Sequence, residues 1–390
     1  TIDFARPGVT VWAKGYYYDP NGTITIKWDN TTVLADNVPT DSEGIFKTNI
    51  TVPLDASTGS HYISVWNGTE FATQEEFHVV EATPVSGIIS ENTTWTRYGS
   101  PYIATGDLLI DENVTLTIED GVVIKVAGYY GIFLASRSLL IANGTGDNPI
   151  IFTSNGSNYP RAWKGISILD NAIGPQILLH NTTIEYAEIA VGIAEGTSGL
   201  VDPIIIIQNC KLTFNSKGIH VYGYGPNVIS NLTLKIEKSI IESNDVGIFV
   251  YIQDSIISIV NNLIRSNNIG IDLEYILGFQ YTPIPVKMLV KQNIIVYNDI
   301  GISFGYLIWS GIQHSEVNIS ENYIARNRIG IFLDLFQLVD SSLTISGNDI
   351  HSNTEYNVEC QTDYGIVSEF NFTYNYWGTT SVEAIAETIY

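Results

Sequence analysis

The most constraining feature of this sequence is a short pattern of asparagine and glycine that recurs through its second half. Each copy has an Asn three residues before a Gly, and the Gly is followed by Ile, any residue and an apolar residue. The copies are NSKGIHV, NDVGIFV, NNIGIDL, NDIGISF and NRIGIFL, with glycines at 218, 247, 270, 301 and 330, so the intervals are 29, 23, 31 and 29 residues. A fixed motif at such intervals is typical of a solenoid, in which loop length varies while the stacked positions do not.

Alignment of the copies gives a second asparagine column and several apolar columns. Apolar residues stand five and three positions before this second Asn, from Ile204 and Ile206 in one copy to Leu343 and Ile345 in a later one. Their period-two alternation predicts strands with one buried face. We therefore expect an all-β chain in which residues 83–390 form a right-handed parallel β-helix with three strands per coil. The second column contains Ser239 and these asparagines: Asn209, Asn262, Asn293, Asn322, Asn348 and Asn375.

Stacked coils place like residues over like at the strand spacing of about 4.8 Å. Asn side chains at a turn can then bond the side chain above and the turn backbone, which forms a ladder. We expect the recurrent glycines to supply a positive φ at the corner. A structural role is thus predicted for the ladder residues Asn262, Asn293, Asn322, Asn348, Asn267, Asn298 and Asn327.

Residues 1–82 predict a small β-sandwich. Alternating runs such as VTVWA (9–13), TITIKW (23–28) and YISVW (62–66) are separated by turn sequences rich in Asp, Asn and Gly. The segment resembles the Ig-like modules of prokaryotic surface proteins, which act as spacers or as assembly or carbohydrate-binding units. Its tryptophans predict either core packing or a platform on which sugars stack; they are Trp12, Trp28 and Trp66.

The remainder of the chain resembles a known family of repeat proteins. The stretches GDLLIDENVTLTIEDGVVIKV (106–126), WKGISI (163–168) and YNYWG (374–378) resemble β-helix proteins of the NosD-like and pectin-lyase-like kind. That family includes polysaccharide-active enzymes, copper-maturation proteins and surface proteins. Its members usually continue for tens of residues after the YWG element, so whether the native chain extends past Tyr390 stays open.

Charge and sequons predict an extracellular location. The net charge of −23 argues against nucleic acid and anionic membranes as partners. We recognise no leader or transmembrane stretch in the printed sequence and expect Thr1 to follow a removed segment. The two cysteines, Cys210 and Cys360, are predicted to lie too far apart for a disulfide.

The composition is typical of archaeal surface proteins. Sequons for N-glycosylation occur at Asn21, Asn30, Asn49, Asn67, Asn92, Asn113, Asn143, Asn155, Asn181, Asn231, Asn318 and Asn371.

Candidate chemistry lies at the outward positions that follow the glycine column. His220, Asp272, Glu274 and Asp334 are the candidate catalytic residues, since a hydrolase needs paired carboxylates and a lyase needs a base beside a cation. Tyr222 and Tyr251 on the same face are candidate glycan-binding residues. An ordinary solvated face would have the same pattern, and the Asp-Asp, Gly-His-Gly and Arg-x-Lys elements of pectin-active enzymes are absent from the sequence.

Metal chemistry has less support in the sequence. The six histidines are scattered and Met288 is the single methionine, which argues against a copper site. Calcium would suit exposed carboxylates, but no ligand run of the D-x-D-x-D-G type occurs, and we assign no metal ligand and no cofactor.

Three functions follow as hypotheses. The favoured one is a secreted, N-glycosylated cell-surface protein with a structural, assembly or adhesive role, of the S-layer-associated or filament type, whose partners are other surface proteins or copies of itself. The alternatives are a polysaccharide lyase or glycoside hydrolase that uses the β-helix face, and a non-catalytic glycan-binding protein.

Overall fold

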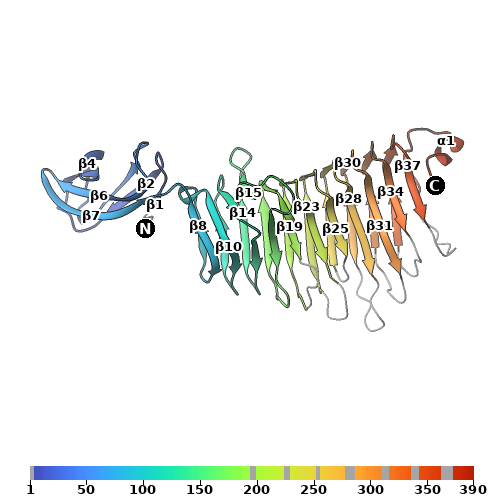
Figure 1. Cartoon of the computed structure of the whole chain (residues 1–390), viewed down its shortest axis with the longest axis horizontal. Helices are drawn as coiled ribbons and strands as arrows, with labels where there is room; N and C mark the ends of the chain where they lie inside the picture. Colours follow the sequence, from blue (N-terminus) through green and yellow to red (C-terminus); the bar gives the residue numbers. More distant parts are fainter. Residues whose placement is uncertain are drawn as a thin grey trace. The chain divides into compact units, whose positions relative to one another are not determined.

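The computed structural model of the chain contains two compact units (Figure 1). The structure describes residues 4–193, 199–223, 229–251, 255–276, 286–308, 316–334, 342–361 and 372–390. The first unit comprises Thr1–Pro84 and Thr96–Tyr102, and the second comprises Val85–Trp95 and Ile103–Tyr390.

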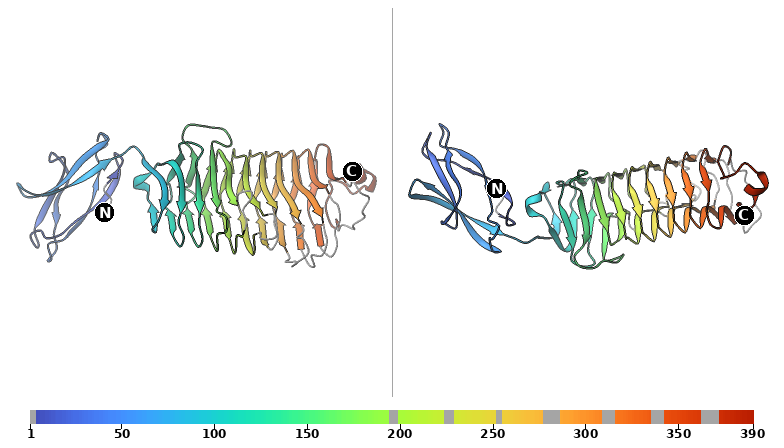
Figure 2. Two further views of the ribbon diagram at one scale, coloured as in Figure 1. Left: turned by 60° about the horizontal axis from the view of Figure 1, so that its bottom comes forward. Right: turned by 90° about the horizontal axis from the view of Figure 1, so that it is seen from above.

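The second unit is a parallel β-helix, which confirms the predicted all-β solenoid (Figure 2). Each coil contributes one strand to each of three faces, and every strand pairs in parallel with its counterpart in the next coil. The first face is a ten-stranded sheet of β9 (Thr93–Trp95), β11 (Thr115–Ile118), β14 (Leu139–Asn143), β17 (Gln176–His180), β20 (Ile204–Gln208), β23 (Leu232–Glu237), β26 (Ser255–Val260), β29 (Lys287–Lys291), β32 (Glu316–Ser320) and β35 (Ser342–Ser346).

The other two faces differ in strand length. The second face has short strands: β12 (Val123–Val126), β15 (Ile150–Ser154), β18 (Thr182–Glu185), β21 (Lys211–Thr213), β24 (Ile240–Glu242), β27 (Leu263–Arg265), β30 (Ile294–Val296), β33 (Tyr323–Ala325) and β36 (Asp349–His351). The third face, called the long face below, has β10 (Tyr102–Ile110), β13 (Gly131–Leu134), β16 (Trp163–Ile168), β19 (Ala187–Ile193), β22 (Lys217–Tyr222), β25 (Val246–Tyr251), β28 (Ile269–Ile276), β31 (Ile300–Ile308), β34 (Ile329–Asp334) and β37 (Tyr356–Gln361). Strand β8 (Thr83–Ile89) and the 3₁₀ turn η1 (Arg97–Gly99) precede the regular coils.

Columns of identical apolar residues fill the interior. Ile207, Ile236 and Ile259 are in register on the first face, and each is fully buried. Burying a side chain of this size contributes about 2 kcal/mol. The predicted inward positions Ile204 and Ile206 were wrong by one residue, because Ile205 and Ile207 are the buried members of that strand.

Two asparagine ladders run along the corners of the coils. In both, each Asn donates from its backbone N–H and its Nδ2 to the Oδ1 of the Asn in the next coil, at 2.9–3.1 Å for the pair Asn262–Asn293 and for Asn215–Asn244. The prediction for Asn209 was wrong, because Asn209 is exposed and Cys210 stands in the ladder position. Cys210 N–H donates to Ser239 Oγ at 3.1 Å, and Ser239 N–H donates to Asn262 Oδ1 at 2.9 Å.

The recurrent glycines are required for a reason that was not predicted. Their φ values are not positive; the left-handed residues are those just before each ladder Asn, such as Asn261 (φ 58°), Gln292 (φ 57°) and Ser266 (φ 56°). A Cβ on Gly270 would lie 2.6 Å from the carbonyl oxygen of Gly301 in the next coil. Glycine is therefore needed for close approach of successive coils.

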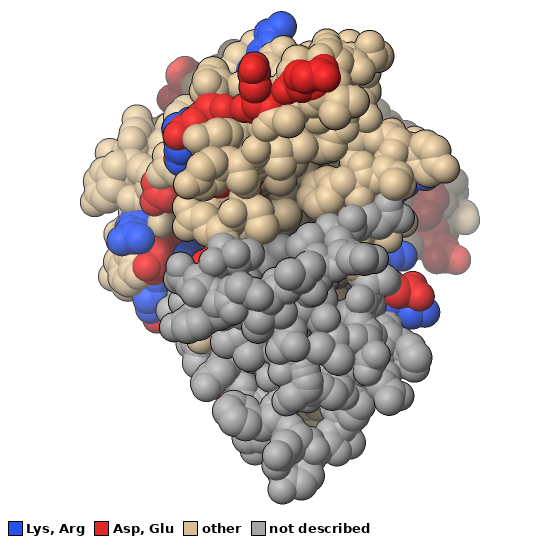
Figure 3. All heavy atoms as spheres, turned by 90° about the vertical axis from the view of Figure 1, so that its right-hand side faces the viewer, with Lys and Arg blue, Asp and Glu red and all other residues tan. Residues whose placement is uncertain are grey.

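The last described residues continue the stacking. Tyr376 pairs with Asp349 on the second face, and Ile389 pairs with Val358 on the long face. Between them lies the short helix α1 (Val382–Ala386), whose first turn is capped by the Ser381 hydroxyl accepting from Ala384 N–H. From the C-terminal end, Figure 3 shows a described surface that is mostly uncharged, with acidic side chains across its upper part and acidic and basic side chains together at both sides.

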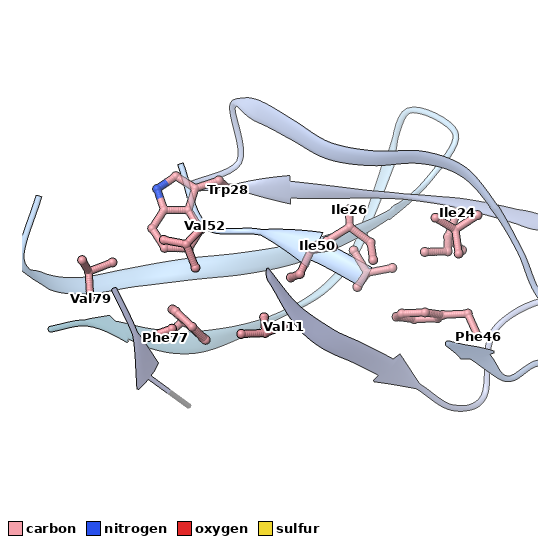
Figure 4. Close-up of a cluster of buried hydrophobic side chains, with 12 residues drawn as sticks. Val11, Ile24, Ile26, Trp28, Phe46, Ile50, Val52, Phe77 and Val79 are labelled. Atoms are coloured by element: carbon pink, nitrogen blue, oxygen red, sulfur yellow. The ribbon is translucent and has the colours of Figure 1, made fainter. Parts of the chain in front are cut away.

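The first unit consists of two sheets around one core (Figure 4). Val11 and Ile50 of the smaller sheet are buried against Ile26 and Trp28 of the larger one. The core confirms Trp28 as a packing residue, whereas Trp12 is 58% exposed. The assignment as an Ig-like module stays a prediction. The larger sheet has the order β1 (Phe4–Ala5), β7 (Glu70–Val79), β6 (Gly59–Asn67), β3 (Thr23–Trp28) and β4 (Thr32–Pro39), and the smaller one pairs β2 (Thr10–Gly15) with β5 (Phe46–Thr51).

Candidate functional site

The candidate site lies on the outward side of the long face, on strands β22, β25 and β28. Two rows of side chains run along the solenoid axis here, because strand residues two apart share a face and like positions stack. The inner row contains His220, Phe249, Asp272, Ser303 and Phe332 in register. The outer row, two positions further along each strand, contains Tyr222, Tyr251, Glu274, Gly305 and Asp334.

Asp272 and Glu274 form a carboxylate pair on β28. Asp272 is 8% exposed, and burial raises its pKa to about 6, with a further rise from the charge of Glu274. A hydrogen bond from Ser303 and the charge of Lys217 oppose this rise. Burial also raises the pKa of Glu274. Two carboxyls with raised pKa values beside one ammonium group are suited to proton transfer near neutral pH.

The aromatic members of the two rows stack on one another. Tyr222 and Tyr251 have ring centroids 4.7 Å apart and planes within 11°, and His220 lies 4.8 Å from Phe249 in the same manner. The facing sides of Tyr222 and Tyr251 are therefore covered. Tyr251 is 8% exposed, whereas Tyr222 is half-buried, so Tyr222 is the member of the pair that a ligand can contact. Lys217 Nζ lies 5.2 Å from the centroid of the Phe249 ring.

The predicted site residues are only partly brought together. Asp272, Glu274, Tyr222 and Tyr251 lie on neighbouring strands, whereas Asp334 lies two coils beyond Glu274, about 10 Å along the axis. His220 faces outward but is fully buried, and Asp272 is almost fully buried. The alternative prediction of an ordinary solvated face was therefore wrong at these two positions.

A second polar cluster lies on the long face and was not predicted from the sequence. Its members are Asp107, Tyr129, Lys164 and Glu188, and it is called the Tyr129 cluster below. Lys164 Nζ forms a salt bridge with Asp107 at 3.1 Å and lies 5.8 Å from the centroid of the Tyr129 ring. Tyr129 is 53% exposed, and its hydroxyl donates to the Glu188 carboxylate. The hydrogen bond to Glu188, with burial, raises the pKa of Tyr129. No repeat motif marks these coils, so only the aromatic and charged composition of the stretch could have indicated them.

Most sequon asparagines lie on the surface. Asn181 is half-buried, and its Nδ2 hydrogen bonds to the Gly144 carbonyl at 3.0 Å. Asn371 lies outside the described residues. The others are exposed: Asn21, Asn30, Asn49, Asn67, Asn92, Asn113, Asn143, Asn155, Asn231 and Asn318.

Within the described ranges, no cluster of three or more His, Cys, Asp or Glu side chains is arranged to hold a metal ion. No helix in this part of the chain has the length and hydropathy to span a membrane. Both thiols are free, and burial raises the pKa of Cys210 to about 11.

The N-terminal part of the solenoid is similar to a known protein family. A family model described as a pectate-lyase-like β-helix domain matches residues 87–219, roughly a third of the chain. The matched region includes the Tyr129 cluster and ends within β22, before Phe249 and Asp272. Among curated proteins, none matches the chain. The fold and this match together support a parallel β-helix.

Proposed function

We propose that this protein is an extracellular β-helix that binds a polysaccharide along its long face and cleaves it with Asp272 and Glu274. The observation that carries the proposal is the carboxylate pair on β28, which lies next to the Tyr222–Tyr251 stack and within reach of the charge of Lys217. The match to a pectate-lyase-like domain supports a polysaccharide ligand.

The rows on the long face suit an extended ligand. Their side chains repeat at the coil spacing of about 4.8 Å, which is close to the length of one sugar residue in a chain. A sugar chain that lies along the axis therefore passes one coil per unit, and the half-buried side chains of Tyr222, Glu274 and Asp334 are the row members that it can contact. The Tyr129 cluster and the Asp272 pair lie on the same face, so one long chain can contact both.

Hydrolysis is the reaction that this geometry favours. Asp272, with a pKa of about 6, is protonated in a larger fraction of molecules near neutral pH than an ordinary aspartic acid, and in that form it can donate a proton to the glycosidic oxygen. The less buried Glu274 can then serve as the base or nucleophile. The strand rise places the two Cα atoms about 7 Å apart. Two acidic groups also disfavour a uronic acid at this position, so we infer a neutral polysaccharide.

The test is an assay of reducing ends and of unsaturated products on neutral and acidic polysaccharides. We expect the wild-type chain to release reducing ends from a neutral polymer. Asp272→Asn and Glu274→Gln should abolish release while affinity electrophoresis still shows binding. Glu316→Gln, an exposed carboxylate on the first face, is the matched control and should leave release unchanged. Binding without release would refute cleavage, and absence of both would refute the whole proposal.

The exposed sequons favour a second candidate, a glycosylated surface protein with a structural or adhesive role. None of the ladder asparagines is in a sequon, and ten sequon asparagines are exposed. Glycopeptide mass spectrometry of the native protein should detect modified sites, and electron microscopy of the cell envelope should show ordered arrays. A protein that is unmodified and monomeric in the native envelope would contradict this role.

A further inference from the structure

The outer face of the two-stranded sheet β2–β5 has an unusual composition. Residues alternate along both strands, so that Val11 and Ile50 enter the core while Trp12 and Asn49 point outward. Trp12 is among the most exposed large side chains of the first unit, although its neighbour Val11 is almost fully buried. Such exposure of an indole needs an explanation, because burying its large apolar surface would be favourable.

Asn49 lies directly across from Trp12. The antiparallel register pairs these two residues, and the pair Thr10–Thr51 on the same face has its hydroxyl oxygens 2.8 Å apart. Side chains that face each other across an antiparallel pair have Cβ atoms about 4.5–5.5 Å apart. A group attached to the Asn49 side chain therefore begins beside the indole.

One side of the Trp12 ring is available to such a group. Lys47 Nζ lies 4.6 Å from the ring centroid, and Lys14 Nζ lies 4.7 Å from the centroid of Tyr16. The two lysines are paired across the strands, and each one leans onto an aromatic ring. One ammonium group covers only one face of an indole, and more than half of the Trp12 surface remains exposed.

Asn49-Ile50-Thr51 is a sequon, and its asparagine is exposed. We propose that the glycan linked to Asn49 folds back onto Trp12, so that the C–H face of its first sugars packs on the open face of the indole. The inference rests on the extracellular glycoprotein character proposed above. Asn318 provides a contrast, because its register neighbours on the first face are Leu289 and Thr344 and no aromatic ring is paired with it.

The test uses the full chain, purified from a host that glycosylates sequons, with occupancy of Asn49 measured by glycopeptide mass spectrometry. Hydroxyl-radical footprinting should show Trp12 oxidised several-fold more slowly in the glycosylated wild type than in Asn49→Gln. Asn318→Gln should leave the oxidation of Trp12 unchanged. These variants keep Trp12 itself intact, so the comparison does not depend on a tryptophan substitution.

A double-mutant cycle supplies the second measurement. Trp12→Ala should raise the unfolding equilibrium constant about fivefold more in the glycosylated chain than in the Asn49→Gln background. An occupied Asn49 with unchanged Trp12 oxidation and additive effects would overturn the inference and leave the glycoprotein proposal intact. An unmodified Asn49 beside modified sequons would also overturn it, and a chain without any modification would overturn both.

Discussion

Replacement of Asn293 by alanine tests whether the asparagine ladder stabilises the solenoid. The Asn293 side chain is 1% exposed. Its Oδ1 accepts from Asn262 N–H at 2.9 Å and from Asn262 Nδ2 at 3.0 Å. Its Nδ2 donates to the Ile259 carbonyl at 2.8 Å and to Asn322 Oδ1 at 2.9 Å. Alanine removes all of these bonds.

The size of the stability loss depends on which hydrogen-bond partners of Asn293 keep another bond after the substitution. Asn262 Nδ2 still donates to the Ile236 carbonyl, and Asn322 Oδ1 still accepts from the Asn293 backbone N–H. The Asn262 N–H, by contrast, loses the acceptor that the ladder supplies, and the Ile259 carbonyl loses the Asn293 amide. A buried polar group without its partner costs about 1–3 kcal/mol. We therefore expect Asn293→Ala to lower the free energy of unfolding by about 3 kcal/mol.

Urea denaturation followed by far-UV circular dichroism measures this change. Because a solenoid can open coil by coil, hydrogen exchange of the peptide that contains Asn262 should accompany it. Asn268→Ala, at an exposed position outside the ladder, is the matched control and should cost less than about 0.5 kcal/mol. Asn293→Ser should cost less than Asn293→Ala, because the Ser239 hydroxyl already accepts a ladder bond from Cys210 N–H. Equal stability of Asn293→Ala and Asn268→Ala would refute the ladder argument.

Three further predictions follow from other features. Burial raises the pKa of Asp272 to about 6 in the folded chain, above the unfolded value of about 3.9. Stability should therefore fall by up to about 3 kcal/mol as the pH rises from about 4 to about 6. Denaturation of Asp272→Asn should show a smaller fall, because of this carboxylate pair only Glu274 then contributes. Gly270→Ala places a Cβ against the Gly301 carbonyl and should lower the free energy of unfolding by about 1–3 kcal/mol. Gly146→Ala is the control, because its Cβ would meet nothing within 4 Å, and its thermal unfolding should match that of the wild type. Burial raises the pKa of Cys210 to about 11 and also raises that of the half-buried Cys360. Because Cys360 is the less buried thiol, a thiol reagent at pH 8 should modify it first. Equal rates of modification would contradict the packing of Cys210.

The sequence predicted the stacked columns wherever alternation was unambiguous, and failed where it was not. Where apolar and polar residues alternate, as in LTLKIE (232–237), the register follows directly. In the coil that contains Ile204–Ile207, four isoleucines in succession remove the alternation. A slip of one residue then exchanges the two faces of a strand, which placed Asn209 in the ladder instead of Cys210.

The corners were harder to predict for a different reason. A left-handed backbone is usually indicated by glycine, yet here it falls on Lys238, Gln292 and Glu321. These side chains vary from coil to coil, so no residue type marks the position. The recurrent glycines were visible in the sequence, but their role in close coil contact depends on the neighbouring coil.

The candidate site was located on the correct side of the strands, but its burial was not predicted. Alternation shows which side chains point outward and gives no information on what covers them. Asp272 has a raised pKa because it is almost fully buried, and that burial depends on contacts distant in sequence. The Tyr129 cluster lies in coils without the asparagine motif, so its members had no column to identify them.

The asparagine ladders also give the solenoid a direction. In the bonds between rungs, each Asn donates its backbone N–H and its Nδ2 to the Oδ1 of the Asn in the next coil, so these bonds all point toward the C-terminal side. Two coil stacks that met by their C-terminal ends would oppose donor to donor, whereas a C-terminal end against an N-terminal end would match donors with acceptors. Contacts of that head-to-tail type do not close into a two-fold dimer and propagate instead as rings or filaments. Hydrogen-bond polarity within a single chain thus limits the symmetry open to any assembly built by coil stacking.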